Sequence, residues 1–117
     1  MDDINWGSIC IEPEVKSWLD SLSEREFGRV GFYLDLLASH GPLLSEPHTK
    51  QLAGKLRELR FFLGPRAMRI TYWIAPERNI VLLTVFAKSK RRDAAQVMRA
   101  RRALWDCREN HVHGGRD

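Results

Sequence analysis

The sequence has few cysteines and no long apolar run. Its two cysteines, Cys10 and Cys107, lie at opposite ends of the 117 residues, with no CxxC pair and no histidine at ligand spacing, so we expect reduced thiols and no zinc site. No apolar stretch approaches the roughly 18 residues that span a bilayer, and no basic segment followed by an apolar one opens the chain. We therefore expect a cytoplasmic protein without a membrane partner.

Internal repeats and low-complexity tracts are also missing. At 117 residues, 44% of them hydrophobic, the chain can supply one modest core but not two. We expect a single domain over residues 1–110 and a flexible tail over residues 111–117, where glycines and polar residues gather.

The charge is moderately basic and unevenly distributed. The formal net charge is +4, which is compatible with nucleic acid or an acidic protein as the partner. Acidic residues concentrate in residues 2–26, whereas Lys50–Arg108 holds most of the lysines and arginines. This asymmetry predicts a basic face built by the second half of the chain.

The first half predicts one strand and two helices. Weak alternation over Ile4–Ile11 favours a strand that ends before Pro13, and Pro13 suits the first turn of a short helix. Ser23 followed three residues later by Glu26 is a capping-box pattern, which starts a second helix that ends before Gly41.

The second half predicts three strands and a last helix. Strands are expected over Lys55–Leu63, Met68–Ile74 and Ile80–Ala87, joined by short turns with glycine, proline or asparagine. Asp93–Arg108 has apolar residues near one helical face. The predicted order is β-α-α-β-β-β-α, an α+β fold in which three consecutive strands form an antiparallel meander.

Cationic residues recur within and beside these predicted strands. Guanidinium groups are costly to desolvate, so a strand that only needs to fold gains nothing from them. An anionic partner explains them better, and arginine offers a planar fork of donors that matches phosphate oxygens. The residues concerned are Lys55, Arg57, Arg60, Arg66, Arg69, Lys88 and Lys90.

Three segments carry a family pattern. Lys50–Arg60 reads KQLAGKLRELR, Arg69–Tyr72 reads RITY, and Val81–Lys90 reads VLLTVFAKSK. Together they resemble the RelE/HigB superfamily of toxins from type II toxin-antitoxin systems, and in particular its phage Gp49-like branch. The first 45 residues match that superfamily only in element order and in the helical hairpin.

The resemblance implies a fold and an activity. It implies a small RelE-like fold, with a helical hairpin and a C-terminal helix packed on a twisted, mainly antiparallel sheet. It also implies a ribosome-dependent mRNA endoribonuclease that inhibits translation through attack of the substrate's own 2′-hydroxyl, with no metal and no cofactor. The implied partners are the ribosome with its mRNA and a cognate antitoxin, often a helix-turn-helix protein from the adjacent gene. Operator DNA is an implied partner only of the complex between toxin and antitoxin.

The motif positions select the candidate site residues. Arg60 and Arg69 occupy the arginine positions of the motifs and are the leading transition-state stabilisers, with Lys88 as a third catalytic candidate. Strand alternation places Arg60 with Glu58 on one face, but whether Arg69 shares that face depends on a register that the sequence leaves open. Predicted RNA-binding residues are Arg57, Arg66, Lys90, Lys55 and Trp73.

Proton transfer is less clearly assigned. Arginine is too basic to act as a general base, which leaves Glu58, His48, Tyr72 or a lysine of lowered pKa. Some members of the superfamily have a tyrosine or histidine near the C-terminus for this purpose, but the predicted last helix contains no tyrosine.

Other readings stay open. Arg60 and Arg69 could simply pair with Glu58 at a sheet surface, and the arginines of the last helix could form a solvated face. The alternative functions are a catalytically degenerate basic module that binds RNA or the ribosome, and a protein-interaction domain that receives an acidic partner helix.

Overall fold

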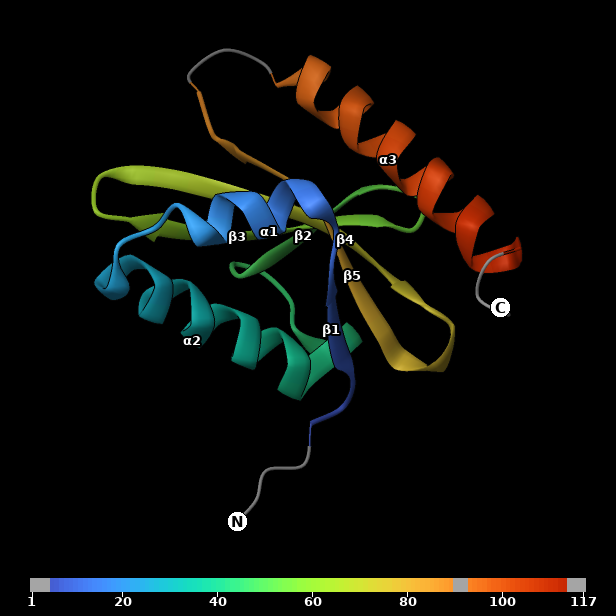
Figure 1. Cartoon of the computed structure of the whole chain (residues 1–117), viewed down its shortest axis with the longest axis horizontal. Helices are drawn as coiled ribbons and strands as arrows, with labels where there is room; N and C mark the ends of the chain where they lie inside the picture. Colours follow the sequence, from blue (N-terminus) through green and yellow to red (C-terminus); the bar gives the residue numbers. More distant parts are fainter. Residues whose placement is uncertain (1–4, 90–92, 114–117) are drawn as a thin grey trace.

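The computed structural model of the chain describes residues 5–89 and 93–113. It contains one five-stranded sheet with helices on both faces (Figure 1). The elements are β1 Ser8–Ile11, α1 Pro13–Asp20, α2 Glu24–His40, β2 Thr49–Ala53, β3 Leu56–Leu63, β4 Arg66–Ala75, β5 Asn79–Ala87 and α3 Ala94–His113, with short 3-10 turns at Gly41–Leu43 and Pro76–Arg78.

The sheet is mixed. Its strand order is β1-β5-β4-β3-β2, in which β2 to β5 are antiparallel neighbours and β1 lies parallel to β5. The apolar run Ile80–Leu83 of β5 is buried, as expected for an interior strand covered on both faces. The predicted α+β fold and its antiparallel meander are therefore confirmed, and the predicted elements occur in the predicted order, with β2 as an additional strand.

Helices α1 and α2 cover one face of the sheet, and α3 lies on the other (Figure 1). Under α1 and α2 the core is large and apolar, and it includes Val15, Leu37 and Ile70. The capping box that starts α2 is formed: the Glu26 amide donates to Ser23 Oγ at 3.1 Å, and the Ser23 amide donates to Glu26 Oε1 at 3.2 Å.

The core under α3 is smaller and fills only half of its face. Its sheet residues come from the start of β3, the end of β4 and the start of β5, and they pack against Ala100, Leu104 and Cys107 of α3. The other half of this face carries polar and charged residues of β3 and β4. The candidate site is built there.

Several boundaries differ from the predictions. Strand β2 was not predicted, because TKQLA has little apolar alternation and pairs along only one edge, with β3. Within the described residues β1 begins at Ser8, and α3 continues past the predicted end at Arg108 to His113. None of the helices in residues 5–89 and 93–113 is long and apolar enough to cross a membrane.

Candidate functional site

Arg60 and Arg69 are direct neighbours across β3 and β4. The register pairs Arg60 with Arg69 and Glu58 with Thr71, so these four side chains share the face that α3 half covers. Arg60 Nε lies 3.3 Å from Glu58 Oε2, and Arg69 Nε lies 3.5 Å from the same oxygen. The two guanidinium groups therefore converge on one carboxylate.

Burial dominates the electrostatics of this cluster. The Glu58 side chain is only 8% exposed and that of Arg69 only 11%. Burial raises the pKa of Glu58 above its ordinary value, although Arg69 and Arg60 act to lower it. Burial likewise lowers the pKa of Arg69, against the opposing effect of Glu58. For both groups, burial has a larger effect on the pKa than the attraction between the opposite charges.

The arginine pair has hydrogen-bond donors without partners among the described residues. Two guanidinium groups face one carboxylate, so the cluster has an excess positive charge. Arg60 Nε and Arg69 Nε are within ion-pair distance of Glu58, yet neither is aligned for a hydrogen bond to any described residue. Arg69 Nη1 donates to the Met68 carbonyl at 3.0 Å. Since buried donors normally find partners, this arrangement suits the arrival of a further anion.

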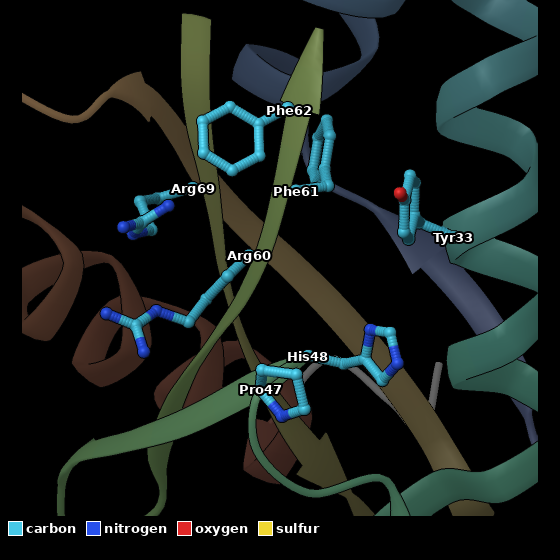
Figure 2. Close-up of a pocket in the computed structure, with 7 residues that line it drawn as sticks. All are labelled: Tyr33, Pro47, His48, Arg60, Phe61, Phe62 and Arg69. Atoms are coloured by element: carbon cyan, nitrogen blue, oxygen red, sulfur yellow. The ribbon is translucent and has the colours of Figure 1, made fainter.

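A hollow of about 320 Å³ lies beside the arginine pair (Figure 2). In the close-up, Arg60 and Arg69 extend to one side of β3, and Tyr33, Phe61 and His48 lie on the other. The hollow therefore has a cationic wall and an aromatic wall. Its lining residues are Tyr33, Pro47, His48, Arg60, Phe61, Phe62 and Arg69.

The unequal lengths of β2 and β3 create this hollow. Strand β2 begins at Thr49, opposite Leu59, so β3 continues beyond it with an edge that no strand covers. The Arg60 amide still donates to the His48 carbonyl at 2.8 Å, which fixes the loop at the rim. Tyr33 of α2 stacks on Phe61 with ring centroids 5.2 Å apart. The aromatic wall is thus held by packing between α2 and the sheet.

Lys88 borders the same face. Phe86 pairs with Arg69 across β4 and β5, and Lys88 follows two residues later, so alternation directs it to the same side. Its backbone amide donates to the Ala67 carbonyl at 2.7 Å, and its Nζ forms an ion pair with Asp93 at 3.1 Å. The structure brings Lys88 to the row next to the arginine pair. The predicted RNA-binding residue Lys90 lies outside the described residues.

Arg57 and Tyr72 lie on the opposite face. Arg57 donates from Nε to the Tyr72 hydroxyl at 3.4 Å and from Nη2 to Thr49 Oγ1 at 3.1 Å. Tyr72 is fully buried, and burial raises its pKa. The structure therefore places Tyr72 away from the arginine pair, because its hydroxyl faces the core under α1 and α2, and we assign it no part in the proposed proton transfer. Arg57 is turned away from the arginine pair in the same way.

Three other predicted RNA-binding residues lie away from the hollow. Trp73 is buried under α3, and its indole nitrogen donates to Cys107 Sγ at 3.2 Å, so its ring is not open to a base in this structure. Arg66 at the β3–β4 turn forms an exposed ion pair with Glu26 at 3.2 Å. Lys55, in the β2–β3 turn, lines a second hollow at the edge of α3.

Of the residues predicted for proton transfer, Glu58 and His48 lie at or beside the hollow. Glu58 contacts both arginines. His48 lines the hollow, half-buried, with its ring centroid 6.5 Å from that of Tyr33. Among the residues that the structure describes, no group of three or more His, Cys, Asp or Glu side chains could hold a metal ion.

The sequence analysis missed the aromatic wall. Tyr33 lies in the middle of α2, and nothing in the sequence links it to Phe61. Lys50 was also missed as a site residue: it pairs with Glu58 in register, and its charge acts to lower the pKa of Glu58. The sequence offered one signal for Lys50, its place as the first residue of the motif segment Lys50–Arg60.

Comparison with known proteins identifies the family and the fold of this chain. Residues 17–105 match the family model described as phage derived protein Gp49-like (DUF891). No curated protein matches the chain. Among solved structures, it is similar to the archaeal RelE–RelB complex from Pyrococcus horikoshii OT3, with 21% identity, a TM-score of 0.53, and coverage of 73% of this chain and 98% of the other.

A second similar structure is the E. coli toxin RelE in the free state, as a mutant in which two arginines are replaced by alanine. It has 15% identity and a TM-score of 0.53, with coverage of 79% of this chain and 90% of the other. These likenesses concern the fold, while the family match covers most of the chain. The chain therefore belongs to the phage-derived Gp49-like family, and its fold is RelE-like, as its sequence motifs predicted.

Proposed function

We propose that the protein is the toxin of a toxin-antitoxin system and cleaves mRNA on the ribosome. The single observation that carries this proposal is the convergence of Arg60 and Arg69 on one side of the sheet, beside a hollow with an aromatic wall. Family membership and the RelE-like fold support it. An arginine pair of this kind suits a phosphodiester, because each guanidinium presents several donors to phosphate oxygens.

The proposed reaction uses a nucleophile from the substrate. The 2′-oxygen attacks the adjacent phosphorus, the bond to the 5′-oxygen breaks, and a 2′,3′-cyclic phosphate and a free 5′-hydroxyl result. Negative charge accumulates on the non-bridging oxygens in the transition state, where Arg60 and Arg69 stabilise it. Each preorganised contact of this type is typically worth about 10²–10³ in rate. Lys88 supplies a further positive charge from the β5 side.

Glu58 is the proposed general base. It must accept the proton of the 2′-hydroxyl, and its carboxylate already lies between the two groups proposed to hold the phosphate. Burial raises its pKa, which makes it a stronger base than an exposed glutamate. His48, on the far side of the hollow, is the proposed donor to the 5′-oxygen.

The proposed partner is an antitoxin. The similar archaeal structure is a complex of RelE with RelB. For this chain we propose an antitoxin encoded by an adjacent gene, a helix-turn-helix protein through which the complex reaches operator DNA. The ribosome and its mRNA are the proposed target of the free toxin.

One observation favours a second candidate function. Tyr72 is buried on the other face, and Glu58 is enclosed by the two arginines, so few groups are available for proton transfer. A catalytically degenerate module that binds RNA or the ribosome through the same cations, or a domain that receives an acidic partner protein, would have this arrangement without needing proton transfer.

A brief pulse of expression followed by primer extension on cellular mRNA tests the proposal. We expect growth arrest and cuts at codon spacing within translated regions, both suppressed by co-expression of the neighbouring gene product. Growth arrest without cuts would support the RNA- or ribosome-binding module instead. Normal growth with intact mRNA would contradict the toxin function and leave the protein-interaction domain.

A further inference from the structure

A second hollow of about 290 Å³ lies between the β2–β3 turn and the C-terminal half of α3. Figure 1 shows this turn lying beside the helix. Its lining includes Lys55 from the turn and Arg101, Trp105 and Arg108 from α3. The hollow thus combines three cations with one large aromatic ring.

The spacing of these residues on α3 explains how the surface forms. Ala100, Leu104 and Cys107 bury one stripe of the helix against the sheet. Arg101, Trp105 and Arg108 recur every three or four residues, so they form a second stripe along its border. Trp105 is 63% exposed. An indole ring with this exposure can stack on a ligand that binds in the hollow.

The charge of this second hollow has no ion-pair partner among the residues that the structure describes. Other arginines have carboxylate partners, as in Arg66 with Glu26 and Arg99 with Glu14. Within residues 5–89 and 93–113, no carboxylate forms an ion pair with Lys55, Arg101 or Arg108. The hollow is therefore complementary to an anionic ligand.

Cations connect this hollow with the arginine pair. Lys50 of β2 lies opposite Glu58 on the same face of the sheet, between the pair and the β2–β3 turn. Lys55 precedes Arg60 by five positions, which corresponds to roughly 17 Å at the usual rise of an extended strand. A few nucleotides of an extended single strand can span this distance.

We propose that the second hollow is a subsite for single-stranded RNA that flanks the scissile phosphate. Trp105 stacks on a base, Lys55, Arg101 and Arg108 pair with phosphates, and Lys50 supports the connecting backbone. An exposed aromatic ring among spaced cations is the usual construction of a surface that binds single strands without reading their sequence. An acidic peptide would match the charge, but it would not account for the continuity with the arginine pair. The inference rests on the proposed function and adds a substrate contact to it.

The test compares two lengths of RNA. Binding of a fluorescein-labelled dodecanucleotide of single-stranded RNA, and of a dinucleotide, is measured by anisotropy at low salt with the full chain. We expect Trp105→Ala to weaken binding of the dodecanucleotide roughly 5- to 150-fold, the range of one lost base stack, and to leave the dinucleotide unaffected. Arg69→Ala should weaken both. Arg101→Ala should reduce the salt dependence of dodecanucleotide binding by about one counterion.

Arg102→Ala is the matched control, because Arg102 is exposed on the same helix and does not line the hollow. Unchanged dodecanucleotide binding in Trp105→Ala, or an equal loss in Arg102→Ala, would overturn the subsite. The subsite would also be overturned if an oligoglutamate peptide bound in a way that depends on Trp105 while RNA binding did not depend on Trp105. That result would assign the surface to an acidic protein partner. If the wild-type protein cleaves mRNA on ribosomes but does not bind the dodecanucleotide, the subsite fails and the proposed function stands. If cleavage is also absent, both fail.

Discussion

Replacing Arg69 by alanine is expected to lower the rate of mRNA cleavage on programmed ribosomes about 10²–10³-fold. Arg69 is the more buried of the two arginines, and its guanidinium lies against Glu58 at the centre of the cluster. Its loss removes a charge that is already in place when the transition state forms. Because water cannot supply a fixed positive charge at this position, kcat should fall, and binding of the RNA should also weaken.

The fold should survive this change. Glu58 keeps Arg60 as a partner at 3.3 Å, and the strand pairing of β4 does not depend on the side chain. Circular dichroism should therefore match the wild type. Arg102→Ala removes the same charge from an exposed position on α3 and should cleave normally. A folded Arg69→Ala protein that remains fully active would show that the site is elsewhere.

Replacing Glu58 by glutamine is expected to lower kcat about 10²–10⁴-fold, the usual contribution of a general base. Glutamine keeps the shape and one acceptor oxygen but cannot take up the proton. Since the change also removes the carboxylate that pairs with both Arg60 and Arg69, RNA should bind more tightly and with a steeper salt dependence. Loss of turnover together with stronger binding would distinguish a base from a group that merely holds the arginines.

The pH dependence follows from the raised pKa of Glu58. Its folded-state pKa lies above the ordinary value of 4.5, so the folded state holds this proton more tightly than the unfolded state. The stabilisation from protonated Glu58 is complete below pH 4.5 and is lost as the pH rises through its folded-state pKa. Glu58→Gln should therefore be at least as stable as the wild type at neutral pH, by thermal melting. Wild-type activity should fall as the pH drops through the same pKa, and the variant should lack this limb.

A clearly less stable Glu58→Gln protein at neutral pH would contradict this account. It would mean that the ion pairs stabilise the fold by more than the desolvation of Glu58 costs. Wild-type turnover that does not change between neutral pH and pH 4.5 would exclude Glu58 as the base and favour His48.

Much of the fold could be predicted from the sequence because it depends on local patterns. The capping box at Ser23 and the stop at Gly41 bound α2, and glycine or proline marks the turns of the meander. The motif arginines likewise identified the two strands that carry the cluster. Strand β2 was not predicted, because it is stabilised by pairing with β3 and its sequence lacks a clear alternation of apolar and polar residues.

The arrangement of the site depended on long-range packing. Alternation placed Arg60 with Glu58, but only the strand register sets Arg69 opposite Arg60. The same register directs Tyr72 and Trp73 into two different cores, which removes both from the hollow. Tyr33 reaches the hollow because α2 crosses the uncovered end of β3, a contact that no pattern within α2 encodes.

A double-mutant cycle of Arg60→Ala and Arg69→Ala, measured as kcat/KM for mRNA cleavage on programmed ribosomes, tests the central claim most directly. If both guanidinium groups hold one scissile phosphate, each single change should be severe and the double change should cost less than the sum of the two, with a coupling of about 0.5–3 kcal/mol. Strictly additive losses, or single variants that cleave as the wild type does, would contradict a shared phosphate.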